Sequence, residues 1–185
     1  MNYSLPLTIE NAVGEKIIFQ KIIHEPDGDK LIVSGSCQPE CGPPMHIHFK
    51  QDECITVKKG KIGYQVQGEE KKFADEGASI LFKRGTPHKF WNAGTEVLEV
   101  ESWVKPADNI IFFLSSIYAA LNKPGAKRPE PFDSAYLLTR YKKEYAMTEL
   151  PSFVRKVIIP VTYFIGRITN RYKKFKEAPS PVGGV

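Results

Sequence analysis

Short apolar runs separated by turn residues characterise the chain up to about residue 106. These runs are rich in β-branched and aromatic residues, and turn signals such as the Pro-Asp-Gly-Asp segment at 26–29 interrupt them. Within 61–67, Ile62, Tyr64 and Val66 occupy every second position, which is the period of a strand with one buried face. Many short strands with turns between them predict an all-β sandwich or barrel.

The apolar period changes after Pro106 from that of a strand to that of a helix. A first helix is predicted to begin near Asn109 and to cover a mouth or an edge strand of the β-region. A second helix is predicted to begin at Asp133 or Ser134 and to continue to Tyr145. The chain therefore divides into a β-region and a helical extension.

The predicted boundaries follow this change of period. Residues 1–106 form the β-barrel domain, residues 107–176 form an α-helical C-terminal extension, and residues 177–185 form a tail rich in proline and glycine. The composition of the tail predicts disorder. A chain of 185 residues suits one domain with appendages.

Charge is distributed unevenly over these regions. The chain carries a net charge of +5, but residues 139–176 hold ten Lys or Arg against two Glu, whereas residues 1–138 hold sixteen against eighteen acids. A protein that grips phosphates usually spreads basic residues over the binding fold. We therefore expect no nucleic-acid partner.

The third predicted helix, over about 152–172, combines an apolar face with basic residues and should be kinked at Pro160. Such a helix can lie on an anionic membrane surface, or it can pack its apolar face on the barrel. Because most amphipathic helices face a core, packing is favoured over membrane contact. The apolar face comprises Phe153, Val157, Val161, Phe164 and Ile168.

The sequence also predicts a cytoplasmic location. No apolar run approaches the roughly 20 residues that cross a bilayer, and the N-terminus lacks the basic start and apolar stretch of a secretory signal. The three cysteines, Cys37, Cys41 and Cys54, do not have the spacing of a disulfide framework, so reduced thiols are expected.

Three of the four histidines belong to one pattern. His46 and His48 lie two residues apart and would face the same side of a strand, and Glu53 follows at the start of the next predicted strand. His88 comes from a distant strand. Imidazole and carboxylate ligands together suit divalent first-row metals, so these four residues are the predicted metal ligands.

This pattern resembles the cupin superfamily, whose first motif is G-x5-H-x-H-x(3,4)-E-x6-G and whose second is G-x5-P-x-G-x2-H-x3-N. The chain reads His46-Ile-His48-Phe-Lys-Gln-Asp-Glu53 and continues to Gly60; it later reads Gly77, Gly85, His88 and Asn92 at the second motif's spacing. Two positions depart from the motifs. Only three residues separate Gly42 from the first histidine, where the motif has five, and Lys83 stands where the second motif has proline.

The resemblance covers about residues 15–106 and implies a jelly-roll barrel with a metal ion inside, near one mouth. It implies a divalent metal such as iron, manganese, nickel or zinc, without selecting among them. Members of the superfamily include dioxygenases, isomerases, epimerases, decarboxylases and non-catalytic binders. They also often dimerise through a sheet edge, so a homodimer is expected.

Several apolar side chains are candidates for lining a substrate pocket, although barrel core is the simpler role for each. They are Phe49, Ile55, Tyr64, Phe82, Phe90 and Trp103. Glu53 is the one candidate catalytic residue, because it could act as a base by loosening from the metal.

Two functions from different classes remain open. The first is a metal-dependent oxygenase that acts on a small organic molecule inside the barrel. The second is a non-catalytic module that binds or senses a small molecule. A sugar isomerase or epimerase ranks lower, because no basic pair suited to a sugar phosphate is evident in the β-region.

Overall fold

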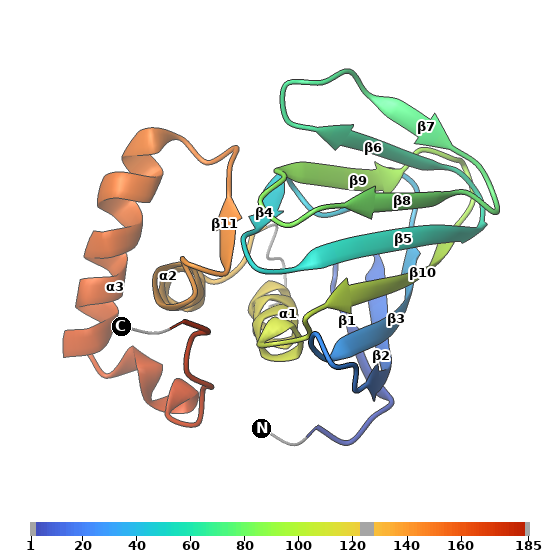
Figure 1. Cartoon of the computed structure of the whole chain (residues 1–185). Coiled ribbons are helices and arrows are strands. Elements are labelled where there is room, and N and C mark those ends of the chain that lie inside the picture. The colour runs from blue at the N-terminus through green and yellow to red at the C-terminus, as the bar shows by residue number, and fades with distance from the viewer. Residues whose placement is uncertain (1–2, 123–127, 184–185) are drawn as a thin grey trace.

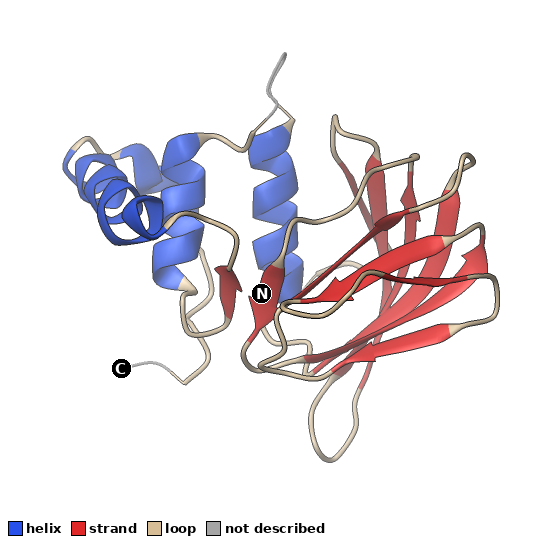
Figure 2. Cartoon of the chain, turned by 90° about the horizontal axis from the view of Figure 1, so that it is seen from above, coloured by secondary structure: helices blue, strands red, loops and turns tan. Residues whose placement is uncertain are grey.

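The computed structural model describes residues 3–122 and 128–183. Two antiparallel sheets form one half of the molecule, and helices gather on the other side of it (Figure 1, Figure 2). The β-rich and helical halves therefore follow the order of the two regions that the sequence pattern predicts.

The larger sheet has six strands, and every pairing in it is antiparallel. The strand that ends the β-region is inserted between two strands from earlier in the chain, which brings distant segments side by side. In spatial order the strands are β1 (Leu7–Glu10), β2 (Glu15–Ile23), β3 (Lys30–Cys37), β10 (Leu98–Lys105), β5 (Asp52–Lys59) and β8 (Ser79–Phe82).

The smaller sheet has five strands and contains three of the four predicted metal ligands. In spatial order these strands are β11 (Tyr145–Met147), β4 (His46–His48), β9 (His88–Asn92), β6 (Ile62–Val66) and β7 (Lys72–Ala74). His46 pairs with His88 across β4 and β9. The ladder therefore places histidines from two distant segments directly opposite each other.

The two sheets have the arrangement of a jelly roll, but strand pairing does not join them into a closed barrel within the described residues. The expected closed barrel is thus corrected to two separate sheets. The physical reason is that the edge strands β8 and β7 each pair on one side only, so no ladder crosses from sheet to sheet.

Apolar residues from both sheets form one buried cluster between them, which we call the interior cluster. Its fully buried members include Ile55 of β5, Ile62 of β6 and Leu98 of β10. Tyr64 and Val66 pack against it, which confirms the predicted alternation along β6. The side chains between the sheets therefore follow the period-two pattern of the sequence.

A second buried cluster joins the sheets to the helices. It combines Phe19 and Leu31 of the larger sheet with Ile110 of α1 (Ile110–Leu121) and Leu137 of α2 (Pro131–Arg140). The first predicted helix thus packs on the larger sheet, and the helical region shares a core with the β-region.

The second predicted helix is shorter than the sequence pattern suggested. It ends at Arg140, and Tyr145 lies instead in β11, where it pairs with His48. The local pattern did not reveal this strand, because β11 has only three residues and depends on the free edge of β4 for its hydrogen bonds.

The third predicted helix begins with a π-helical turn, Val154–Ile158, and continues as α3 (Ile159–Ile168), followed by a 3-10 turn, Arg171–Phe175. Its apolar face does not pack on the β-region: Phe153, Phe164 and Ile168 are 65%, 62% and 64% exposed. The prediction that this face packs on the barrel is therefore wrong.

In the described part of the chain, no helix has the length and apolarity that a bilayer crossing requires.

The tail that composition predicts to be disordered contacts the helical region where it is described. The Pro179 carbonyl accepts hydrogen bonds from Tyr141 and Arg140, and the Val182 amide donates to the Glu144 carboxylate. Residues 184–185 lie outside the described residues.

The shared core predicts that the helical region and the sheets unfold together. Replacing Leu137, which is 0% exposed, with alanine should cost about 2–5 kcal/mol of unfolding free energy because it leaves a cavity beside the larger sheet. Urea denaturation followed by circular dichroism and by tryptophan fluorescence measures this. Leu81→Ala, at a position 48% exposed, is the matched control and should cost under about 1 kcal/mol. Separate transitions for sheet and helix signals would contradict the shared core.

Candidate metal centre

Three short elements bring the four predicted ligands together. His46 and His48 are the first and last residues of β4, and both face the space between the sheets because side chains two apart share a side. Glu53 is the second residue of β5, and His88 is the first residue of β9. One ligand thus comes from the larger sheet and three from the smaller sheet.

The ligand atoms of these four residues lie within 4.8 Å of one another. The His88 Nε2 atom is 3.1 Å from the Glu53 Oε2 atom, and the His48 Nε2 atom is 3.7 Å from the same oxygen. Two ligands about 2.1 Å from a common ion and at right angles to it are about 3.0 Å apart. The donor set and its spacing therefore fit one divalent cation.

Hydrogen bonds at the other ring nitrogen fix the tautomer of each histidine. The Nδ1 atoms of His46 and His88 lie 2.9 Å from the carbonyl oxygens of Pro44 and Thr86. A carbonyl oxygen only accepts, so each Nδ1 carries the proton. The Nε2 lone pairs are then directed toward Glu53, as metal binding by imidazole requires.

His48 is held by a side chain that the sequence analysis missed. Its Nδ1 atom lies 3.1 Å from Gln51 Oε1, and the Gln51 amide nitrogen donates to the Tyr145 hydroxyl at 2.9 Å and to the Ala107 carbonyl at 3.3 Å. The Tyr145 ring also packs edge-on against the His48 ring, 5.5 Å between centroids. Buried Gln51 therefore links a predicted ligand to β11 and to the start of the helical region.

The pKa shifts of the clustered side chains favour the protonation states that bind a cation. Burial, reinforced by the neighbouring His48 and His88, lowers the pKa of His46 to about 3. Burial also lowers the pKa of His48. Burial alone would raise the pKa of Glu53, but its contact with His88 Nε2 and the other nearby histidines hold it at about 2. At neutral pH, His46 and His48 are thus uncharged imidazoles that can bind a metal ion, and they lie beside a carboxylate anion.

Apolar side chains of the interior border the cluster on one side. The Phe82 ring stacks on the His88 ring at 3.9 Å with an interplanar angle of 5°. Phe82 and Ile55 are buried members of the interior cluster, and Tyr64 and Phe90 pack against it. These four of the six predicted pocket residues lie on the interior side of the sheets, where core packing occupies them.

The other two predicted pocket residues lie elsewhere. Phe49 is 41% exposed, in the turn after β4. Trp103 neighbours the buried Val104 along β10 and so points to the opposite face of the larger sheet, where the Lys30 ammonium lies 4.6 Å from its ring centroid. The sequence did not distinguish these positions because both are apolar residues next to inward-facing ones.

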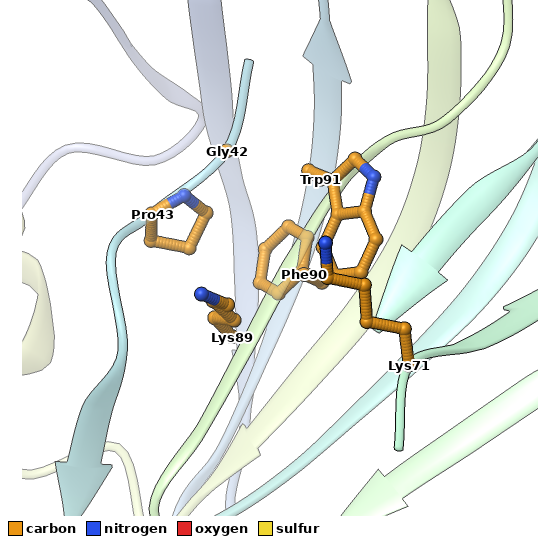
Figure 3. A pocket seen from close by; sticks show the side chains of 6 residues that line it. All are labelled: Gly42, Pro43, Lys71, Lys89, Phe90 and Trp91. Carbon is orange, nitrogen blue, oxygen red and sulfur yellow. The ribbon is translucent and has the colours of Figure 1, made fainter. Parts of the chain in front are cut away.

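A separate pocket of about 230 Å³ lies beside β9 (Figure 3). None of the four predicted ligands lines it. Its lining is Gly42, Pro43, Lys71, Lys89, Phe90 and Trp91. Of the predicted pocket residues, Phe90 alone is in this lining.

The offset glycine of the first motif has a structural role here. A Cβ atom at Gly42 would come within 2.1 Å of the Phe90 carbonyl oxygen, so only glycine lets this segment lie on β9. Hydrogen bonds between Asn92 and the backbone at Glu40 and Cys41 hold the two segments together. This contact positions the chain that leads into β4.

Lys83, the other departure from the motif, lies in the turn between β8 and β9. Its ammonium is 3.5 Å from the Asp52 carboxylate, which also accepts hydrogen bonds from the Arg84 backbone and guanidinium. Arg84 lowers the pKa of Asp52 to about 2 despite opposing desolvation. The turn before His88 is therefore tied by charge to the residue before Glu53.

Comparison with known proteins gives one family. The sequence profile of the Cupin_2 family, described as a cupin domain, matches residues 36–104. This span includes all four predicted ligands. It contains β4, β5 and β9 but not β11 or any helix.

Two curated relatives each match about a third of this chain. The chain is 37% identical over 67 residues to a protein named "Probable oxidoreductase virH" from Hypocrea virens, covering 35% of this chain and 31% of that protein. It is 36% identical over 67 residues to "Oxidoreductase iacF" from Pestalotiopsis fici, covering 35% and 33%. The matched segment thus spans about a third of the length of these relatives.

A solved structure from Klebsiella pneumoniae, of a protein with a double-stranded beta-helix domain, matches with a TM-score of 0.42 and 22% identity. The match covers 50% of this chain and 78% of that chain.

The first test of the site removes one ligand. His48→Ala should lower the bound metal per chain by more than about tenfold, because it removes an imidazole nitrogen from the cluster. Plasma mass spectrometry of the purified protein measures the metal. His24→Ala is the matched control, since the His24 side chain is 81% exposed and does not belong to the cluster. Unchanged stoichiometry in the His48 variant would refute the ligand assignment.

The second test addresses the support of His48. Gln51→Leu keeps a similar volume but removes the hydrogen bond to His48 Nδ1, and it should weaken metal affinity by about 10–100-fold. Competition with a fluorescent chelator gives the affinity. Gln65→Leu, at a glutamine on β6 that bonds the Glu69 carbonyl, should leave the affinity unchanged. Equal affinity in the two variants would show that Gln51 does not position the ligand.

Proposed function

Residues 36–104 of this chain form a cupin domain, and we propose that it binds one divalent metal ion through His46, His48, Glu53 and His88 and oxidises a small organic molecule there. The convergence of these four side chains within 4.8 Å carries the proposal. The names of the curated relatives, both oxidoreductases, support the reaction class.

The ligand set leaves room for chemistry. Three imidazoles and one carboxylate fill four positions, so a six-coordinate iron or manganese ion would keep positions for a substrate and dioxygen. When bound, such an ion would supply the redox step. The protein's part is to hold the three rings by their Nδ1 protons and to restrict water at the largely buried ligands His48 and His88.

Glu53 has a restricted role as a base. A carboxylate with a pKa of about 2 accepts a proton poorly while His88 and the other two histidines surround it. It becomes a stronger base only when it is released from its partners, because burial alone raises its pKa. Glu53 is therefore proposed as a ligand first and as a proton acceptor only after release.

A non-catalytic binding module is the second candidate. The Nδ1 partners of the three histidines are two backbone carbonyls and one glutamine. The nearby Tyr145 hydroxyl is held by Gln51, and burial raises its pKa well above the usual value. A site formed by three histidines and one carboxylate, that of Glu53, suits the binding of a polar molecule as well as its oxidation.

Oxygen uptake separates the two candidates. We expect the protein loaded with ferrous iron or manganese to consume dioxygen when a suitable small organic acid or enol is added, and the zinc-loaded protein to consume none. An oxygen electrode, with a panel of such compounds, measures the rate. Glu53→Gln keeps the shape of the side chain but removes its charge, and it should reduce the rate by more than about tenfold.

The metal content of the protein as isolated completes the comparison. Full occupancy by zinc, together with no uptake from the iron- or manganese-loaded forms, would count against the oxidation and favour the binding module. Ligand-induced shifts in thermal stability of the zinc form would then identify what it binds.

A further inference from the structure

The C-terminal helix presents an apolar stripe to solvent. The most exposed of its side chains are Phe153, Phe164 and Ile168, and Val157 and Val161 are 40% and 51% exposed between them. Their spacings of four, four, three and four residues put them on one helical face. An exposed apolar surface of this kind usually marks an interaction site.

The opposite face of the same helix packs against other residues of the chain. Gly166 is buried, and a Cβ atom there would come within 2.3 Å of the Tyr172 ring. Tyr163 stacks on Tyr172 with 5.4 Å between centroids, and Tyr136 of α2 lies 5.0 Å from Tyr172. Figure 1 shows α3 at the outer edge of the molecule with α2 between it and the sheets. The apolar stripe is therefore the side that packing within the chain leaves free.

The charge around the stripe has one sign. Residues 151–176 contain seven Lys or Arg and no Asp or Glu. Lys174 pairs with Asp133, and Lys176 lies near Glu177. Arg171 lies over the Phe132 ring. Within the described residues, no ion pair or ring contact involves the remaining four cations, which are Arg155, Lys156, Arg167 and Lys173. The segment that carries the stripe thus holds four cations that have no ion-pair partner among the described residues.

We propose that this helix docks on an anionic phospholipid surface, with the stripe inserted at the level of the acyl chains and the cations facing the headgroups. An interfacial helix combines these two features, an apolar face and flanking Lys or Arg. Each basic residue near an anionic leaflet strengthens binding about fivefold.

A second copy of the chain fits the same surface less well. Two-fold pairing brings the same patch of both copies together, so the four cations without a partner in one copy would face the same four in the other. An anionic lipid surface has the complementary charge. The charge distribution therefore selects the membrane surface over self-association.

Vesicle flotation with the full chain tests the proposal. The protein should float with vesicles of phosphatidylcholine mixed with phosphatidylserine, and not with phosphatidylcholine alone. Raising the salt concentration should release it, because the Debye length shortens from about 10 Å at 0.1 M to about 3 Å at 1 M. No flotation with the anionic vesicles would overturn the proposal.

Two sets of substitutions separate the apolar and the charged contributions. The combined change Phe153→Ser, Phe164→Ser and Ile168→Ser should abolish flotation, and these exposed positions contribute little to folding. The combined change Arg155→Gln, Lys156→Gln and Arg167→Gln should lower partitioning about 100-fold.

The matched control removes exposed apolar side chains elsewhere. Phe73→Ser with Leu81→Ser, at sheet positions 54% and 48% exposed, should float like the original protein. Circular dichroism checks that every variant is folded, and Phe164→Ser alone, with an expected partial loss, replaces the triple variant if that one unfolds. Equal flotation of the serine variant and the control would overturn the proposal. So would sedimentation that shows a dimer, lost in the serine variant, without flotation.

Discussion

The placement of four polar, ionisable side chains between apolar sheets, two of them buried and two partly buried, is the constraint on which the rest of the structure depends. An unpaired imidazole or carboxylate in such an environment is costly, so each needs a partner of fixed geometry. The Nδ1 atoms donate hydrogen bonds to the backbone carbonyls of Pro44 and Thr86 and to the side-chain oxygen of Gln51, and the Nε2 atoms converge on Glu53. These partners come from the segments that flank the short strand β4 and from the turn before β9.

This constraint extends from the sheets into the helical region. Gln51 reaches the Ala107 carbonyl and the Tyr145 hydroxyl, and Tyr145 belongs to the strand that pairs with β4. The same tyrosine contacts the α1 residue Phe113, 4.3 Å between ring centroids. Packing of the helices is thus mechanically connected to the orientation of His48, and the helical region is part of the framework of the proposed metal centre.

The match to the cupin family model is confined to residues 36–104. It contains the four ligands and their immediate turns but omits β11, the helices and the Tyr145 support. The substrate, in contrast, is recognised by side chains that vary around a conserved framework, so an activity of the longer relatives extends to this chain only as a proposal.

The sequence alone determined the β-rich region, its alternating strands and the four residues predicted to bind metal, because strand period and motif spacing are local properties that each segment carries by itself. Tertiary structure decided that the sheets stay separate, that Tyr145 lies in a strand, and that Phe49 and Trp103 lie away from the interior cluster. It also decided that the apolar face of the last helix remains exposed. An amphipathic pattern has the same period whichever partner covers it, and only the three-dimensional contacts of Tyr136, Tyr163 and Tyr172 reveal which face the chain itself uses.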